Sequence, residues 1–562
     1  MDQNNSYIKK LFYEKKFLEL IHFIENQIKD KSSRHLNILG VTRLLYEKNK
    51  DSFQLALSDF KLSYLKEKHS EIGLEAFINY INASVDYYDL LNQTRSFKDH
   101  ETFFNETLEL YNEVKKKISY NSKLFYALAR VYKRLNKFEE TSHHYNLLYK
   151  NKDLNLTGVT SWVFFNNYLK NWRQQDYFYY SKLLNFYSKK YPTEELTPVL
   201  ANKNHKIKIG FLSADILRRH SITNFLKTIL LNYDKDKFEI YLFLNHPKIF
   251  DDETTQDFKK LVSKYFYIDC LNDIEVINLV RNENIDIMFD LMGLTSSHRT
   301  SLFKNRLAPV QITWLGYCNT TGLNEMDYLI ADPNLIYPEE EKYYAENIIY
   351  MPNIWSCHSG FSFKPNTHNP PCLKNNFITF GSFNNFAKIN KDVVYTWSKV
   401  LQNIKGSKLI LKSSVRVRTS ELKKMFQDFG VLNSVVFLEN EASFERHLNL
   451  YNEIDIALDT FPYNGVTTSF EALWMGVPVI TMRGYNFNSR CGESIIKNTK
   501  IDYLIASNKS EYVQKAIYLA NNIKELLKIR KKLFNTVLST PLFDTKSFAK
   551  EFEDTLINIF KK

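Results

Sequence analysis

Two adjacent threonines and a carboxylate stand where a helix is expected to begin. Thr467 and Thr468 follow a Pro/Asn/Gly turn at 462–465, and Glu471 comes three residues after Thr468, which is capping-box spacing. The first turn of such a helix offers N–H groups and the positive end of the helix dipole, so it suits a phosphate. An ordinary crossover helix capped by threonine is the other interpretation of this pattern.

A lysine on a second loop could complete such a phosphate site. Lys388 follows the string GSFNN, in which Asn384 and Asn385 are polar, at a point where a loop turns into a helix after a strand. A lysine there can neutralise a β-phosphate and stabilise a departing nucleoside diphosphate. Most lone lysines lie on the surface, and that is the competing interpretation.

Two histidines stand near expected strand ends. His220 would open the helix that follows the strand at 207–215, at the edge where open α/β sheets bind ligands. His447 lies on a predicted helix that leads into the strand at 454–458. Taken alone, His220 would be a cap or surface residue and His447 a half-buried helix residue.

The elements that must position these residues are short apolar runs separated by helical segments. This alternation indicates parallel sheets of Rossmann type. The predicted strands form a first set at 207–215, 238–245, 286–293, 309–317 and 326–332, and a second set at 376–385, 407–414, 435–440, 454–458 and 479–482.

Residues 1–200 are predicted to be helical throughout, because Gly and Pro are nearly absent and apolar residues recur at spacings of three and four. Two patches, Leu36–Phe60 and Phe125–Tyr149, resemble tetratricopeptide (TPR) units, although their separation is irregular. A solenoid of such units would offer a concave surface to a protein or peptide, or would serve homo-oligomerisation. A plain helical bundle is the alternative. Residues 201–206 are the expected linker.

Composition excludes several other classes. The net charge of +12 comes mostly from lysines scattered over 562 residues, which is typical of a solvated surface, so no nucleic acid is expected. No apolar run is long enough to span a membrane, and the polar start MDQNNSYIKK is unlike a signal peptide. Five cysteines without a CxxC pair indicate a reduced, cytoplasmic protein.

Several separated strings resemble the family of O-GlcNAc transferases and SPINDLY proteins, which are protein glycosyltransferases. LDTFPYNGVTTSFEALWMGVPVITM (458–482) is similar to the family's sugar-nucleotide loop, and GSFNNFAKIN (381–390) to its lysine motif. SADILRRHSITNF (213–225), residues 308–332 and residues 541–548 also resemble family strings in the same order. The resemblance covers about residues 205–560.

The resemblance implies an α/β GT-B fold, with two Rossmann-like halves at 205–370 and 371–562, preceded by an all-α TPR-like domain at 1–200. It implies catalytic roles for His220 and Lys388. It implies a donor site made of Asn384, Asn385, Lys388, His447, Asn464, Gly465, Thr467, Thr468 and Glu471. No metal or other cofactor is expected, because Lys388 and a helix N-terminus can hold the leaving group. A DxD string, Asp234–Asp236, lies in a polar turn instead of after an apolar strand.

The implied activity is inverting transfer of a sugar to Ser or Thr of polypeptides, with UDP-GlcNAc as the first choice of donor. GDP-fucose, used by SPINDLY-type members, is the alternative, and Val466 stands where O-GlcNAc transferases commonly have histidine. Two other classes stay open. The chain could be a TPR scaffold whose transferase region senses nucleotide sugar, or a glycosyltransferase that acts on a glycan or lipid.

Overall fold

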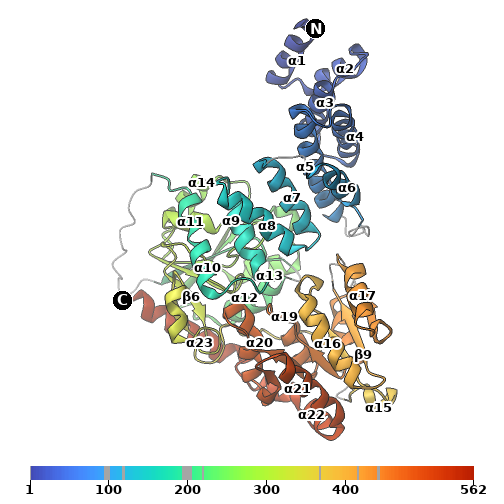
Figure 1. Cartoon of the computed structure of the whole chain (residues 1–562). Coiled ribbons are helices and arrows are strands. Elements are labelled where there is room, and N and C mark those ends of the chain that lie inside the picture. Colours follow the sequence, from blue (N-terminus) through green and yellow to red (C-terminus); the bar gives the residue numbers. More distant parts are fainter. Residues whose placement is uncertain are drawn as a thin grey trace. The chain divides into compact units, whose positions relative to one another are not determined.

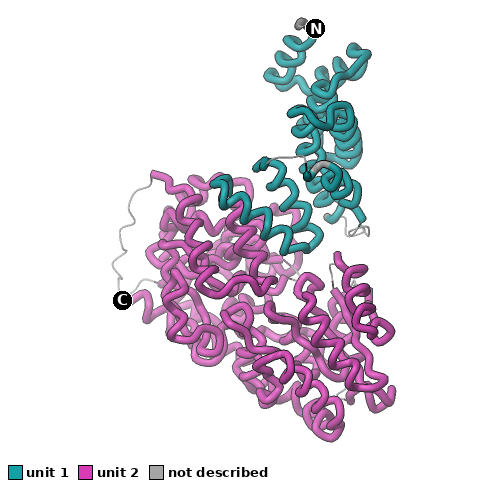
Figure 2. Tube along the Cα trace, in the orientation of Figure 1, with its two compact units in different colours: residues 1–154 teal, residues 155–562 magenta. Residues whose placement is uncertain are grey.

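The computed structural model describes residues 2–93, 102–116, 120–192, 206–217, 220–365, 369–413, 417–439 and 443–561. The chain divides into two compact units, Met1–Leu154 and Asn155–Lys562 (Figure 2). Figure 1 labels many of the helices of both units. Most of the expected linker, 201–205, lies outside the described residues.

The first unit is helical, as the sequence predicts. The TPR-like patches fall on two pairs of packed helices, α3 with α4 and α7 with α8. A Cβ at Gly40 would lie 2.7 Å from the Phe60 ring, so glycine lets α3 and α4 approach closely. The helices are α1 (Asp2–Tyr13), α2 (Phe17–Gln27), α3 (Ser33–Tyr46), α4 (Lys50–Lys66), α5 (Glu71–Gln93), α6 (Asn105–Val114), α7 (Ser122–Arg134) and α8 (Phe138–Lys150).

The second unit contains two sheets whose paired strands are all parallel. The first has the order β3-β2-β1-β4-β5-β6-β7. Its strands are β1 (Ile207–Ser213), β2 (Phe238–Leu244), β3 (Lys264–Tyr267), β4 (Ile287–Asp290), β5 (Val310–Thr313), β6 (Tyr328–Ala331) and β7 (Asn347–Tyr350). Its helices include α12 (Ser221–Asn232), α13 (Glu253–Leu261) and α14 (Asp273–Asn282). The five predicted strands are confirmed, and β3 and β7 are additional.

The second sheet has the order β10-β9-β8-β11-β12-β13. Its strands are β8 (Thr379–Ser382), β9 (Lys408–Lys412), β10 (Val435–Leu438), β11 (Ile456–Leu458), β12 (Val479–Met482) and β13 (Ile505–Ala506). The helices are α15 (Cys372–Asn375), α16 (Lys391–Asn403), α17 (Thr419–Asp428), α18 (Phe444–Asn449), α19 (Thr467–Trp474), α20 (Phe487–Lys497), α21 (Lys509–Asn521) and α22 (Ile523–Leu538). The predicted strands are confirmed, with β13 in addition.

Three helices that the sequence assigns to the N-terminal domain pack against the first sheet's loops instead. They are α9 (Leu156–Asn166), α10 (Gln174–Ser181) and α11 (Leu183–Tyr187). The Gln174 side chain donates a 2.8 Å hydrogen bond to Asn319 Oδ1. Gly322, with a φ of +76°, lies so close to Ser181 that a Cβ would come within 2.3 Å of its backbone. The compact unit therefore begins at Asn155, well before the predicted boundary near residue 200.

The last helix, α23 (Thr545–Phe560), also crosses between the halves of the second unit. It follows the second sheet in sequence but packs on α12 of the first half. The Phe552 ring stacks on Phe289 at 5.6 Å and lies 4.9 Å from the Trp314 ring. These aromatic contacts tie the chain's C-terminal end to the N-terminal Rossmann half.

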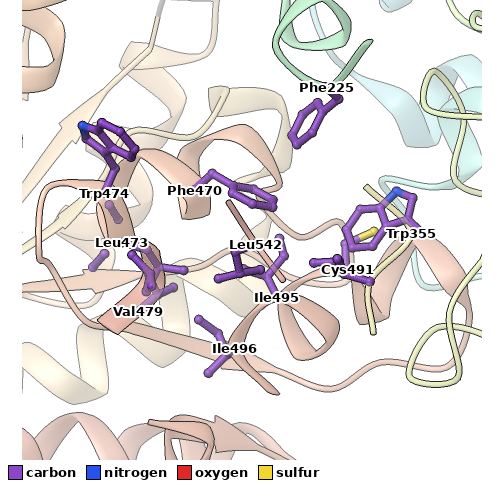
Figure 3. Packing of buried hydrophobic residues seen from close by; sticks show 14 of the residues in the cluster. Phe225, Trp355, Phe470, Leu473, Trp474, Val479, Cys491, Ile495, Ile496 and Leu542 are labelled. Atoms are coloured by element: carbon purple, nitrogen blue, oxygen red, sulfur yellow. The ribbon is translucent and has the colours of Figure 1, made fainter. Parts of the chain in front are cut away.

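An apolar cluster joins the two halves (Figure 3). Phe225 of α12 meets Phe470 of α19 edge to face, with ring centroids 5.3 Å apart. The buried His358 ring stacks on Phe470 at 5.6 Å, and burial lowers the pKa of His358 to about 3. Cys491, Ile495 and Ile496 extend the cluster from α20.

Among the described residues, no helix combines the length and the apolar character that crossing a membrane needs. Each of the five cysteines is a free thiol.

A buried ion pair also holds the two halves together. Arg490 of α20 donates to both carboxylate oxygens of Glu340, at 2.5 and 2.8 Å, and its guanidinium lies 4.0 Å from the centroid of the Tyr337 ring. The Arg490 side chain is only 6% exposed. Removing one partner of such a pair leaves an uncompensated buried charge.

We therefore expect Glu340→Gln to lower the free energy of unfolding by about 3 kcal/mol, measured by urea denaturation. The exposed neighbour Glu339 provides the matched control, because Glu339→Gln removes the same charge from the same turn. Equal stability of the two variants would contradict a structural role for the pair.

Candidate functional site

The candidate site lies where two adjacent strands end. Strands β8 and β11 pair in parallel, with Ala457 opposite Gly381, so the loops that follow them leave the same edge of the sheet. The first loop carries Asn384, Asn385 and Lys388, and the second carries residues 460–466 and leads into α19. Open α/β sheets bind ligands at this edge.

A buried aspartate fixes the second loop. Asp459 Oδ1 accepts hydrogen bonds from the backbone N–H groups of Gly465 at 2.7 Å and Thr460 at 2.8 Å, and Oδ2 accepts from the Thr481 hydroxyl at 2.7 Å. Burial raises the pKa of the Asp459 carboxyl to about 6, against these hydrogen bonds and the nearby charge of Lys388. The carboxyl group thus closes residues 460–465 into a compact turn.

Asn464 and Gly465 fit tightly in this turn. Asn464 Nδ2 donates to the Thr460 carbonyl at 2.8 Å, and Asn464 Oδ1 accepts from the Gly492 N–H at 3.2 Å. A Cβ at Gly465 would come within 2.3 Å of Thr468 Oγ1 and 2.7 Å of Asn384 Oδ1. Only glycine fits there without moving these two side chains.

Lys388 ends a short 3₁₀ turn, η4 (Phe386–Lys388), and points at the second loop. Its ammonium donates a 2.8 Å hydrogen bond to the Asn464 carbonyl and lies 4.1 Å from the centroid of the Tyr463 ring. Burial lowers the pKa of Lys388, and the Asp459 carboxylate opposes that shift. An ammonium has three donors, so this group can bind an anion while it keeps its bond to Asn464.

The start of α19 differs from the prediction. The predicted capping box between Thr468 and Glu471 is wrong, because Val466 is the N-cap residue and no side chain caps the helix. The Thr468 hydroxyl instead donates to Asn384 Oδ1 at 3.0 Å, across to the loop after β8. The helix N-terminus therefore begins without a side-chain acceptor, as an anion-binding terminus requires.

Glu471 belongs to a buried polar network. Lys412 donates to His447 Nδ1 at 2.8 Å, and His447 Nε2 lies 3.0 Å from Glu471 Oε2. Because an ammonium cannot accept, Nδ1 must be the acceptor and the Nε2 proton must point to the carboxylate. The Tyr451 hydroxyl donates to the same Glu471 oxygen at 2.8 Å. Glu471 is therefore held in one orientation.

A cleft of about 1120 Å³ lies between the two Rossmann halves of the second unit. Thr467 and Glu471 line it from the second half, and Ser221, Asn224 and Lys227 line it from the first. Of the predicted site residues, only Thr467 and Glu471 belong to this lining. Lys388 with Asn464, and Asn384 with Thr468, are joined instead by hydrogen bonds between the two loops.

His220 lies on the opposite half. It is the N-cap residue of α12, where its Nδ1 accepts from the Ile222 N–H at 3.5 Å. Its Nε2 lies 3.5 Å from Asp215 Oδ1. Burial raises the pKa of Asp215, and His220 opposes that shift. Among the described residues, no hydrogen bond or ion pair joins His220 to the predicted residues of the second half.

The structure brings together most of the predicted residues: Asn384 with Thr468, Lys388 with Asn464, and His447 with Glu471. Asn385 is exposed and caps η4 through the Ala387 N–H. Asp459, Tyr451 and Tyr463 also belong to the site, and the sequence did not predict them. Asp459 directly follows a buried strand and Tyr451 lies four residues after His447, so spacing alone could have found these two.

Comparison with known proteins gives a family match and a structural match. The model of the family described as "Glycosyl transferase family 41" matches residues 186–360 and 366–552. The solved structure of a mutant O-GlcNAc transferase from Thermobaculum terrenum aligns with 94% of this chain and 98% of its own, at 24% identity and a TM-score of 0.77. This likeness confirms the predicted GT-B fold with helices before it.

Two curated relatives come from Arabidopsis thaliana. One, named "Probable UDP-N-acetylglucosamine--peptide N-acetylglucosaminyltransferase SPINDLY", is 32% identical over 374 residues, which is 65% of this chain and 40% of that protein. The other, whose name has SEC in place of SPINDLY, is 24% identical over 358 residues. The chain thus spans less than half the length of these relatives.

The Asp459 carboxyl makes the stability of the fold depend on pH. Its pKa is raised from an ordinary 3.8 to about 6, so the folded state favours the protonated form. The ionised form therefore costs about 3 kcal/mol of stability above pH 6, and this cost disappears as the pH falls towards 3.8. We expect wild type to gain about 1 kcal/mol relative to Asp459→Asn between pH 7.5 and pH 5.

Urea unfolding at the two pH values measures this difference. Asp502, an exposed aspartate, provides the control, since Asp502→Asn is expected to follow wild type at both pH values. A constant gap between wild type and Asp459→Asn would contradict the raised pKa.

Proposed function

The chain belongs to glycosyl transferase family 41, and from this premise we propose that it is a protein O-glycosyltransferase. It transfers N-acetylglucosamine from UDP-GlcNAc to Ser or Thr side chains of polypeptides. The observation that carries the proposal is that the Lys388 ammonium donates to the Asn464 carbonyl, in the loop that leads into the uncapped start of α19. Two positive groups there suit a diphosphate.

In this proposal the donor diphosphate binds between Lys388 and the first turn of α19. Thr467 and Thr468 supply N–H groups of the helix start, and Asn384 orients Thr468 through its hydrogen bond. Asn385, Asn464 and Gly465 complete the loop edges beside the phosphates. Glu471, fixed by His447, accepts hydrogen bonds from the ribose hydroxyls.

The reaction is a single displacement. The acceptor hydroxyl oxygen bonds to the anomeric carbon while the bond from that carbon to the β-phosphate oxygen breaks, so the configuration inverts. The hydroxyl proton leaves to a base, and the nucleoside diphosphate departs with the electron pair. Negative charge grows on the leaving phosphate, and Lys388 with the α19 N–H groups stabilises that charge more in the transition state than before it.

His220 faces this chemistry from the other half. It opens α12, and the residues directly after it line the cleft. We assign it contacts with the donor sugar and the acceptor, and Asp215 at 3.5 Å would orient its ring. No metal is required in this scheme, because the lysine and the helix terminus supply the charge that the leaving group needs.

The identities of donor and acceptor rest on the relatives. Their names specify UDP-N-acetylglucosamine and peptide, which favours UDP-GlcNAc over GDP-fucose and a polypeptide over a lipid or glycan. The helical first unit would bind the polypeptide. Homo-oligomerisation through that unit and a cytoplasmic location stay predictions.

Thermal unfolding with UDP, GDP, UDP-GlcNAc and GDP-fucose in parallel tests the donor. A ligand at about 100 times its dissociation constant stabilises the folded state by about 2.7 kcal/mol, which is measurable as a melting shift. A shift with the uridine pair supports the proposal. A shift with the guanosine pair alone reassigns the protein to O-fucosylation, and no shift with any of the four ligands contradicts the donor site itself.

Incubation of the purified protein with a cell extract and a sugar-labelled donor tests the chemical class of the acceptor. Label in the polypeptide fraction, removed by protease, is the expected result. Label confined to the lipid extract would reassign the chain to a lipid or glycan acceptor.

We expect Lys388→Ala to lower the transfer rate at least about 100-fold, the scale on which one donor to a developing oxyanion acts. The variant is expected to fold with a lower melting temperature, because it loses the ammonium that partly compensates the buried Asp459 carboxylate, so the rate is measured well below that temperature. Release of nucleoside diphosphate by chromatography measures the rate.

Lys391→Ala is the matched control. Lys391 is exposed, lies three residues further along at the start of α16, and carries the same charge. Normal turnover by Lys388→Ala, or an equal loss in Lys391→Ala, would remove Lys388 from the site.

A further inference from the structure

The turn between α9 and α10, residues 167–173, lies outside both Rossmann halves yet contacts the donor loop. The Tyr168 ring packs against Tyr463 with centroids 4.8 Å apart. The Lys170 ammonium lies 5.7 Å from the centroid of the Phe461 ring and pairs with Asp392 at the start of α16. Two residues of the donor loop, Phe461 and Tyr463, thus contact this one turn.

A second contact anchors the turn itself. The Tyr485 hydroxyl donates to the Leu169 carbonyl at 3.3 Å, and the Arg173 guanidinium lies 5.3 Å from the centroid of the Tyr485 ring. Tyr485 follows β12 in the second half, so the turn is attached to the same half that carries Lys388. The turn and the donor loop therefore form one structural assembly.

Tyr463 connects this assembly to the Lys388 ammonium. The Lys388 ammonium lies 4.1 Å from the centroid of the Tyr463 ring. The Tyr463 backbone carbonyl accepts a 2.7 Å hydrogen bond from the Thr460 hydroxyl. The backbone is fixed by that bond, so the remaining freedom of Tyr463 is rotation of its side chain. The Tyr168 ring occupies space that this rotation would need.

We propose that Tyr168 is a positioning residue that acts through the Tyr463 ring to hold the Lys388 ammonium where the donor diphosphate binds. The inference rests on the proposed function, because it concerns the same diphosphate site. A cation over an aromatic face in a desolvated site is a substantial interaction, and it depends on ring orientation. Tyr168 acts in this role through its ring, which contacts the Tyr463 ring.

Binding measurements by calorimetry separate positioning from general packing. We expect Tyr168→Leu to weaken UDP binding about tenfold and to leave uridine binding unchanged, because only UDP has the phosphates that Lys388 contacts. Tyr168→Phe keeps the ring and should bind both as wild type does. Tyr179→Leu, at an exposed tyrosine of α10, is the matched control and should change neither.

A double variant tests the route of action. In a Lys388→Ala background, Tyr168→Leu should cause no further loss of UDP affinity, since its effect passes through the missing ammonium. Tyr463→Leu removes the ring that Lys388 contacts, and it replaces Tyr168→Leu if that variant does not fold. The same loss of UDP affinity with unchanged uridine affinity is expected from it.

Equal weakening of UDP and uridine, or UDP affinity equal to wild type in Tyr168→Leu, would overturn the inference and leave the proposed function intact. If wild type binds GDP and not UDP, GDP and guanosine replace the uridine pair in the same comparison. If wild type binds neither diphosphate, both the proposed function and this inference are overturned.

Discussion

The candidate site depends on one buried carboxyl group. Asp459 directly follows the central strand β11, and its bonds from the Thr460 and Gly465 N–H groups fold residues 460–465 back so that Gly465 meets the first turn of α19. The bond from the Thr481 hydroxyl ties the carboxyl group to β12. That fold places the Asn464 carbonyl and the Tyr463 ring beside Lys388, which comes from the neighbouring strand's loop. Desolvating a carboxylate is costly, and the hydrogen bonds and the nearby ammonium offset that cost.

Contacts outside the sheets hold this edge in place. The turn after α9 supports the donor loop through Tyr168, and Arg490 of α20 ties the second half to the first through Glu340. α23 returns to pack on the first half, and Phe225 meets Phe470 across the halves. The cleft therefore lies between two halves that are joined by a core, an ion pair and a helix, which limits how its walls can separate.

Much of this arrangement was predictable from sequence because parallel central strands are continuous apolar runs bounded by turns. β3 and β7 were not predicted because they are the edge strands of the first sheet and are partly exposed, and β13 has only 2 residues. The predicted capping box is wrong because the Thr468 hydroxyl donates instead to Asn384, which is 84 residues away in the sequence. Likewise, the pairing of His447 with Glu471 and of Tyr168 with Tyr463 is set by tertiary packing that local patterns do not carry. The family resemblance, confirmed by the family match, singled out residues that spacing could not, and their roles stay predictions.

In the proposed mechanism, the Lys388 loop and the start of α19 together bind a nucleoside diphosphate. A crystal structure of the protein soaked with UDP tests it most directly, with GDP in a parallel soak. We expect the β-phosphate to lie within about 3 Å of Lys388 Nζ and of the N–H groups of Thr467 and Thr468. A diphosphate bound elsewhere, with the Lys388 ammonium still occupied only by Asn464 and Tyr463, would contradict it.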